Sequence, residues 1–250
     1  MTEVTIHHWT ASDDVDLAWR EVGEGAPVLL LHGLFSDANV NWIKFGHAAK
    51  VAATGKRVIM PDLRAHGLSG KPHDPSYYPP GILGRDLIEF VAQLGLSAYD
   101  LGGFSLGART AVQGVGKGLT PRRAMLGGMG LEGLEKWTGR SQFFVDAIAA
   151  FDTASRGDPH WLAVQFMKTM KVDREAAIPL LASFESAPDG WKAAFTMPTL
   201  ILCGADDHDN GSAPDLAAAL PHATYVEVPG AHMSSVTTPQ FGDALAAFLE

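Results

Sequence analysis

The sequence predicts an α/β protein with a mostly parallel, doubly wound sheet that carries helices on both faces. Short apolar runs recur along the 250-residue chain, and they end at turn-forming residues. The runs are continuously apolar rather than alternating, which is typical of strands covered on both faces. Segments with helical spacing of apolar residues separate them, and strand–helix repeats of this kind form right-handed crossovers in a parallel sheet.

The first two predicted strands differ from the others. Residues 4–9 and 15–21 alternate between apolar and polar side chains and are joined by a polar turn, which predicts an antiparallel hairpin at the edge of the sheet. Continuous apolar runs then follow at residues 28–31, 57–60, 99–104, 123–126, 199–203 and 223–228. We interpret each of these runs as one strand of a single sheet.

Helix starts and apolar stripes define the helices that lie between these strands. Residues 83–94 carry one apolar stripe at helical spacing, and residues 241–249 carry another. The second stripe begins after Thr238, a suitable N-cap residue, and a proline occupies its first turn. Ser212 lies three residues before Asp215, a spacing that predicts a further helix start of the capping-box kind.

One long stretch interrupts the alternation of strands and helices. Between the runs at 123–126 and 199–203 there is no clear buried strand, and aromatic and methionine residues fall at helical spacing. We expect residues 130–197 to form a small helical insertion that lies on the sheet. Residues 1–129 and 198–250 would then make up the α/β core.

Charge and composition argue against several classes of protein. Nineteen Lys and Arg against 28 Asp and Glu give a net charge of −9, which is unfavourable for binding nucleic acid or an anionic membrane surface. The single cysteine, Cys203, excludes an internal disulfide and a cysteine-based zinc site. The first residues lack the basic stretch of a secretory signal, and no apolar run is long enough to span a membrane. We expect a soluble, cytoplasmic protein, and the sequence leaves open whether it forms a homo-oligomer.

Residues 103–107 have the pattern G-x-S-x-G and lie where an apolar strand meets a helix. A serine in so sharp a turn tolerates only small residues two positions before and after it, and Gly103 and Gly107 meet this requirement. The turn exposes the hydroxyl of Ser105 at a helix N-terminus, where backbone N–H groups favour negative charge. Ser105 is therefore a candidate nucleophile.

A general base and an orienting carboxylate are needed before a serine hydroxyl acts as a nucleophile. Both occur later in the chain, since Asp206 and Asp207 follow one predicted strand and His232 follows the next. The carboxyl ends of parallel strands meet at one edge of the sheet, where such sheets bind ligands. We therefore expect Ser105, His232 and one of the two aspartates to meet at that edge.

A fourth motif, His32-Gly33-Leu34-Phe35, follows the strand at 28–31 and reaches the same edge of the sheet. Acyl transfer develops negative charge on a carbonyl oxygen, and N–H donors must already face that position. We expect the amides of Leu34 and Leu106 to be these donors, the first held by a tight turn at Gly33. His32 is expected to fix its own loop by hydrogen bonding.

Together these motifs resemble those of α/β-hydrolase-fold enzymes, in order and along nearly the whole chain. The matching positions are His32-Gly33, the loop at 61–69, residues 103–107, Gly204-x-x-Asp207 and Gly230-x-His232. The acid of that family usually lies three residues after the strand-ending glycine, which favours Asp207 over Asp206. Ala65 replaces a glycine of the family's D-x-R-G-x-G-x-S loop, and this departure concerns only the shape of the loop. The resemblance implies that residues 130–197 form the family's cap domain.

The serine at this position implies acyl chemistry, because relatives that open epoxides use an aspartate there and dienelactone hydrolases use a cysteine. The resemblance is strongest to small bacterial carboxylesterases. It implies hydrolysis of small or medium acyl esters through an acyl-enzyme, with no cofactor and no metal. The residues that it implicates are Ser105, Asp207 and His232 as the triad, Leu34 and Leu106 as the oxyanion hole, and Phe35, Phe104, Trp137 and Met233 as substrate contacts.

Other reactions remain open on the sequence. The same triad serves carbon–carbon hydrolases, perhydrolases, lactonases and a pyruvate-eliminating lyase of menaquinone synthesis. His208-Asp209-Asn210 stands where that lyase usually has a Lys-Phe pair, which counts against it. A ligand-binding receptor on this fold is an alternative of a different class. Arg109 is expected to be structural, although it would also suit a substrate carboxylate.

Overall fold

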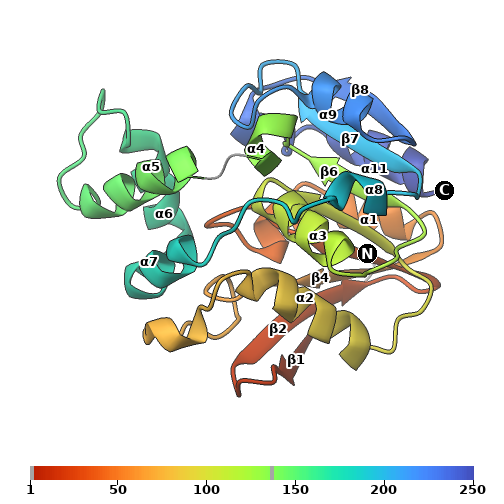
Figure 1. The fold of residues 1–250 in the computed structure, drawn as a ribbon, viewed down its shortest axis with the longest axis horizontal. Coiled ribbons are helices and arrows are strands. Elements are labelled where there is room, and N and C mark those ends of the chain that lie inside the picture. Colours follow the sequence, from red (N-terminus) through yellow and green to blue (C-terminus); the bar gives the residue numbers. More distant parts are fainter. Residues whose placement is uncertain (1–2, 136–137) are drawn as a thin grey trace.

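The computed structural model describes residues 3–135 and 138–250, in which eight strands form one sheet with helices on both faces (Figure 1). The strands are β1 (Thr5–Thr10), β2 (Asp16–Val22), β3 (Ala26–Leu31), β4 (Lys56–Pro61), β5 (Asp100–Phe104), β6 (Ala124–Gly127), β7 (Thr199–Gly204) and β8 (Ala223–Val228). Their order is β1-β2-β4-β3-β5-β6-β7-β8. The β1–β2 and β2–β4 pairs are antiparallel and the other pairs are parallel. The predicted fold class and edge hairpin are confirmed.

Helices bury both faces of the sheet, as the continuous apolar runs predict. One face is covered by α2 (Ile82–Gln93), α3 (Leu106–Gly116), α8 (Trp191–Ala194) and α9 (Ala213–Ala219), and the other by α1 (His47–Ala52) and α11 (Pro239–Leu249). Leu29 and Leu31 of β3 pack on the first face, whereas Val28 and Leu30 pack on the second, and all four are fully buried. No helix of the described residues has the length and apolar character that a bilayer crossing requires.

Two of the predicted helix starts are formed by side-chain caps. The hydroxyl of Thr238 accepts a hydrogen bond from the amide of Phe241 at the start of α11. The hydroxyl of Ser212 accepts one from the amide of Asp215 at the start of α9. The second half of the predicted capping box is absent, because the amide of Ser212 donates instead to the carboxylate of Glu132 at 2.8 Å.

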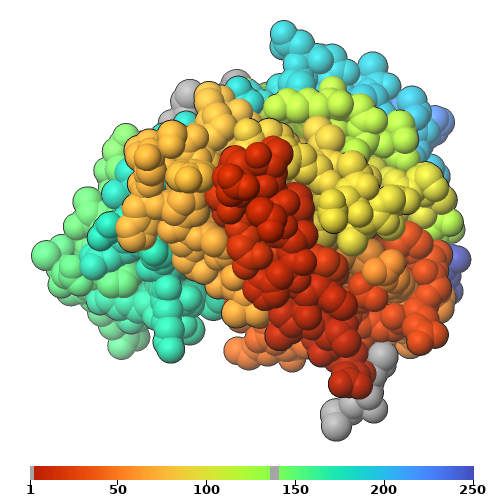
Figure 2. Space-filling model, turned by 90° about the horizontal axis from the view of Figure 1, so that it is seen from below, coloured from red at the N-terminus to blue at the C-terminus, as the bar shows by residue number. Residues whose placement is uncertain are grey.

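The segment between β6 and β7 is helical, with α4 (Leu131–Glu135), α5 (Thr138–Ala149), α6 (Trp161–Met170) and α7 (Arg174–Ala182) preceding α8. Helices α5, α6 and α7, called here the three-helix cluster, share an apolar core and lie at one end of the sheet (Figures 1 and 2). Helices α4 and α8, which flank the three-helix cluster in the sequence, belong with the α/β core, because α4 packs against α9 and α8 packs against α3. Only the middle of the expected cap, residues 130–197, is therefore a separate cluster.

His73 connects the core to the three-helix cluster. Its Nε2 lies 2.9 Å from Asp173 Oδ2, and its Nδ1 lies 3.0 Å from Glu175 Oε2. Asp173 also caps α7 by accepting hydrogen bonds from the amides of Glu175 and Ala176. The hydrogen bond with Asp173 raises the pKa of His73, so the contact favours the charged imidazolium.

We expect this contact to weaken as the pH rises. A histidine whose folded-state pKa is raised contributes stability that is fully present below its unfolded pKa and is lost as the pH rises through its folded pKa. Hydrogen-exchange protection factors of residues 174–177 should fall across that interval in the wild-type protein. They should stay constant in His73→Gln, and an equal pH dependence in both proteins would contradict the assignment.

Candidate active site

Ser105 lies between β5 and α3 in a strained backbone conformation, with φ 53° and ψ −109°. Such a conformation costs a non-glycine residue on the order of 1–3 kcal/mol, so the surrounding structure has to hold it. A Cβ atom on Gly103 would lie 2.2 Å from the carbonyl carbon of Gly107, and one on Gly107 would lie 2.1 Å from the carbonyl oxygen of Leu31. The expectation that only the smallest residues fit on both sides of Ser105 is confirmed.

His232 bridges Ser105 and Asp207 at the carboxyl edge of the sheet. Its Nε2 lies 3.0 Å from Ser105 Oγ, and its Nδ1 lies 2.9 Å from Asp207 Oδ2. The three side chains follow β5, β7 and β8. His232 and Asp207 are buried and Ser105 is half-buried, whereas Asp206 is exposed. Of the two aspartates that the sequence left open, Asp207 is therefore the one that contacts the imidazole.

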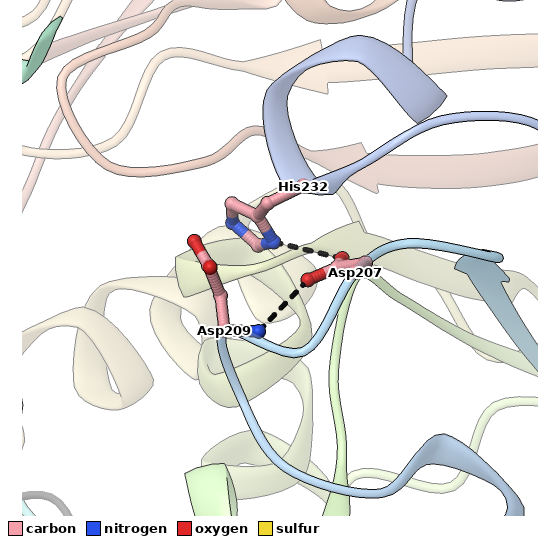
Figure 3. A group of neighbouring side chains, drawn as sticks. All are labelled: Asp207, Asp209 and His232. Carbon is pink, nitrogen blue, oxygen red and sulfur yellow. Dashed lines mark hydrogen bonds and ion pairs between the residues drawn. The ribbon is translucent and has the colours of Figure 1, made fainter.

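Three donors surround the carboxylate of Asp207. Besides His232, the amide of Asp209 donates to Oδ1 at 3.2 Å (Figure 3). The thiol of Cys203 lies 3.4 Å from Oδ2. Burial raises the pKa of Asp207, but the hydrogen bond and charge of His232, together with the hydrogen bonds from Asp209 and Cys203, outweigh it, and the net pKa lies below its ordinary value. Burial and the charge of Asp207 raise the pKa of Cys203 to about 12, so the thiol keeps its proton. Asp207 is thus an ionised acceptor for the imidazole N–H.

Asp207, Asp209 and His232 also form a group of potential metal ligands, since donor atoms of the three lie within 4.8 Å of one another (Figure 3). Both ring nitrogens of His232 are already hydrogen-bonded, Nδ1 to Asp207 and Nε2 to Ser105. A metal ligand needs a nitrogen lone pair directed at the ion. The geometry therefore fits a hydrogen-bonded chain that starts at Ser105, and we assign no metal to this group.

The loop after β3 carries the amide that the sequence predicts as an oxyanion donor. The amide of Ser36 donates to the carbonyl of Gly33 at 3.2 Å and closes a turn in which Phe35 has φ 59°. A positive φ at the third position is a feature of type II turns. The predicted tight turn at Gly33 is formed, and the residue of this turn with a positive φ is Phe35.

Two backbone amides, one in the loop after β3 and one at the start of α3, are free to donate. Within the described ranges, 3–135 and 138–250, the amides of Leu34 and Leu106 have no hydrogen-bond acceptor. Leu106 is the first residue of α3, and the first N–H groups of a helix have no partner within it. These are the two amides that the sequence analysis expected at the site.

His32 is fully buried and fixes its own loop, as expected. Its Nδ1 donates to the carbonyl of Gly33 at 2.8 Å, and its Nε2 accepts from the amide of Leu63 at 2.9 Å. Burial lowers the pKa of His32. Asn41 adds a second anchor, since its Oδ1 accepts from the amide of Gly33 at 3.0 Å. Sequence reasoning did not single out Asn41.

Two of the residues expected to contact substrate, Phe35 and Phe104, are buried. Phe35 is 3% exposed and packs into the three-helix cluster, with its ring edge-on to that of Phe144. Phe104 is also 3% exposed, and its ring lies 5.1 Å from the imidazole of His232 and against Phe241. Phe104 therefore supports His232 from within the core.

The other two expected substrate contacts are Met233 and Trp137, and Arg109 was expected to be structural. Met233 follows His232 at the surface and is 51% exposed. Trp137 lies outside the residues that the structure describes. Arg109 is buried, and its Nη1 donates to the carbonyl of Glu185 at 3.1 Å, which ties α3 to the segment after α7. This contact accords with the structural role expected for Arg109.

The chain belongs to the alpha/beta hydrolase family, whose model matches residues 28–247. It is similar to an epoxide hydrolase 2 of Siraitia grosvenorii, with 33% identity over 108 residues that cover 42% of this chain and 33% of that protein. It is also similar to an sn-1-specific diacylglycerol lipase of Mus musculus, with 40% identity over 86 residues that cover 34% of this chain and 26% of that protein. The matched segments thus span a third or less of these two relatives.

Solved structures share the whole fold. An esterase from Exiguobacterium antarcticum superposes with a TM-score of 0.78 at 18% identity and covers 97% of this chain and 98% of its own. Identity this low is evidence for the fold alone. The family match confirms the resemblance that the motifs indicated.

Proposed function

We propose that this protein is a serine hydrolase that cleaves carboxylic esters with small or medium acyl groups through an acyl-enzyme intermediate. The observation that carries the proposal is the hydrogen-bonded chain from Ser105 Oγ through His232 to Asp207. Its order and tautomer suit proton removal from Ser105, because Nδ1–H is engaged by a carboxylate and Nε2 is left to accept.

In the first half of the reaction, Ser105 attacks the ester carbonyl while His232 takes its proton. The C–O bond to the alcohol then breaks, and His232 returns the proton to the departing oxygen. Asp207 holds the ring in place and stabilises the imidazolium, consistent with its lowered pKa. The products of this half are the free alcohol and an ester of Ser105.

In the second half, water attacks the acyl group with His232 again acting as the base. The bond to Ser105 Oγ breaks, the hydroxyl regains its proton, and the carboxylic acid leaves. In both halves the amides of Leu34 and Leu106 donate to the oxygen that becomes negative. Losing one such donor typically costs about 10²–10³-fold in rate.

The nucleophile favours esters over the epoxide named in one relative. An epoxide opened by Ser105 would leave an ether on the enzyme, and water has no carbonyl to attack in an ether. An ester of Ser105 has such a carbonyl and is hydrolysed through the same oxyanion donors. Turnover through a covalent intermediate at Ser105 therefore requires an acyl substrate.

Active-site labelling combined with turnover tests this proposal. The protein should hydrolyse p-nitrophenyl acetate and butyrate, and a fluorophosphonate should add to a single serine that peptide mass spectrometry locates at Ser105. Pre-incubation with substrate should slow the labelling, and styrene oxide should not be consumed. Absence of ester turnover, or stoichiometric labelling at another serine such as Ser36, would refute the proposal.

A further inference from the structure

Two buried histidines exchange hydrogen bonds between the loop after β3 and the loop after β4. Nε2 of His32 accepts from the amide of Leu63 at 2.9 Å, and Nε2 of His66 accepts from the amide of Phe35 at 3.0 Å. The Nδ1–H of each ring donates to a backbone oxygen of its own loop, at 2.8 and 2.9 Å. Because an amide N–H can only donate, both rings carry their proton on Nδ1.

Both imidazoles are uncharged. His32 is fully buried and His66 is 4% exposed, and their rings meet edge to face with centroids 5.0 Å apart. Burial, with a further contribution from the charge that His32 would carry, lowers the pKa of His66 to about 3. Protonation of Nε2 would destroy the acceptor, so this environment keeps the hydrogen bond to Phe35 intact down to acidic pH.

The amide of Leu34 lies between two backbone amides, of Gly33 and Phe35, that each donate a hydrogen bond to a side chain. On one side the amide of Gly33 donates to Asn41, and on the other the amide of Phe35 donates to His66. Phe35 has φ 59°, a conformation that L-residues avoid unless their surroundings enforce it. Its buried ring and its bond to His66 supply that enforcement.

We propose that His66 is a positioning residue for the oxyanion hole, which acts by holding the amide of Phe35 so that the neighbouring amide of Leu34 points at the site where the oxyanion forms. The inference rests on the function proposed above. His66 itself touches no reacting atom. Without its acceptor, Phe35 relaxes towards negative φ, and rotation of the adjoining peptide displaces the Leu34 donor.

Two variants of His66 form a matched pair. In His66→Asn, the side chain keeps a donor near the position of Nδ1, close to the carbonyl of Arg64, but is too short to reach the amide of Phe35. In His66→Gln, the longer side chain returns an acceptor to the position of Nε2. The two substitutions are alike in polarity and differ in reach, so their difference reports the bond to Phe35.

We expect His66→Asn to lower kcat for p-nitrophenyl butyrate by about 10- to 100-fold, because small displacements of a catalytic group have effects of that order. KM should change little, since the donor acts on the tetrahedral state rather than on the bound ester. Inhibition by phenylboronic acid, which forms a tetrahedral adduct with Ser105, should weaken in parallel. His66→Gln should recover most of both losses.

The outcomes separate this inference from the proposed function. If His66→Asn keeps the wild-type kcat and boronate affinity, the inference is overturned and the proposed ester hydrolase function stands. The same holds if both variants lose kcat and boronate affinity equally and in proportion to their loss of thermal stability. If the wild-type protein cleaves no ester, the proposed function fails. Nitrogen-15 chemical shifts of the wild-type His66 ring then still test the hydrogen bond from the amide of Phe35 to Nε2, and a ring protonated on Nε2 would overturn the inference.

Discussion

Replacing Ser105 with alanine should lower kcat/KM for p-nitrophenyl butyrate by about 10⁴- to 10⁶-fold, the range found when the nucleophile of a triad is removed. Without the hydroxyl no acyl-enzyme forms. The only reaction left is direct attack of water on the bound ester, which the two oxyanion donors still assist. The fold should survive, because the hydroxyl is half-buried and its one described side-chain partner is His232. Thermal unfolding measured on the same samples checks this second expectation.

Ser183→Ala is the matched control for this experiment. Its hydroxyl is buried and donates to the carbonyl of Leu180, so it takes no part in the hydrogen-bonded chain of Ser105, His232 and Asp207. It should lose a small amount of stability and keep its turnover. Ester cleavage by Ser105→Ala near the wild-type level would show that Ser105 is not the nucleophile, whatever the behaviour of the control.

The strands and the turn at residues 103–107 were predictable because each leaves a contiguous pattern in the sequence. β3 sits in the middle of a sheet covered on both faces, so every residue from Val28 to Leu31 is apolar and the run is visible in the sequence. A Cβ on Gly103 would meet the backbone of Gly107, and a Cβ on Gly107 would meet the backbone of Leu31 in β3. Both requirements leave their mark within five consecutive residues, so the sequence shows them.

The choice between Asp206 and Asp207 depended on the loop after β7, which the sequence alone left open. The amide of Asp207 donates to the carbonyl of Gly204 at 3.0 Å, and that of Asp206 donates to the carbonyl of Gly230 at 3.1 Å. These bonds curl the loop so that Asp207 turns inward and Asp206 faces solvent. Neighbouring residues with the same chemistry are distinguished only by such backbone contacts.

The expected substrate contacts rest on proximity to Ser105 and His232 along the chain, which does not by itself fix the direction of a side chain. Phe104 precedes Ser105 on β5, and its ring packs beneath the sheet against Phe241. Successive strand residues point to opposite faces, so this placement was within reach of the pattern. The contact of His66 could not be predicted from a local pattern, because its partner Phe35 is 31 residues away in another loop.

Asp207→Asn is expected to lower kcat/KM by about 10⁴-fold although it barely changes the size of the side chain. An asparagine amide donates to Nδ1 of His232, which moves the ring proton to Nε2. A protonated Nε2 cannot accept the proton of Ser105, and the charge that stabilises the imidazolium is also lost. Nitrogen-15 chemical shifts of His232 would detect the change of tautomer directly.

Asp206→Asn is the control, because Asp206 is the neighbouring residue, carries the same charge and is exposed. Its turnover should stay near the wild-type value. The pH dependence of stability gives an independent check. The folded pKa of Asp207 is lowered, so its contribution to stability is present above the unfolded pKa and is lost as the pH falls through the folded value.

Wild type should therefore exceed Asp207→Asn in free energy of unfolding at neutral pH, and the difference should shrink in acid, as urea unfolding would measure. A large loss of turnover in Asp206→Asn with little in Asp207→Asn would reverse the assignment of the acid. If both variants kept full activity, His232 would need no carboxylate, and the chain of hydrogen bonds that supports the proposed mechanism would be a packing feature. The two variants together thus decide between a catalytic and a structural role for Asp207.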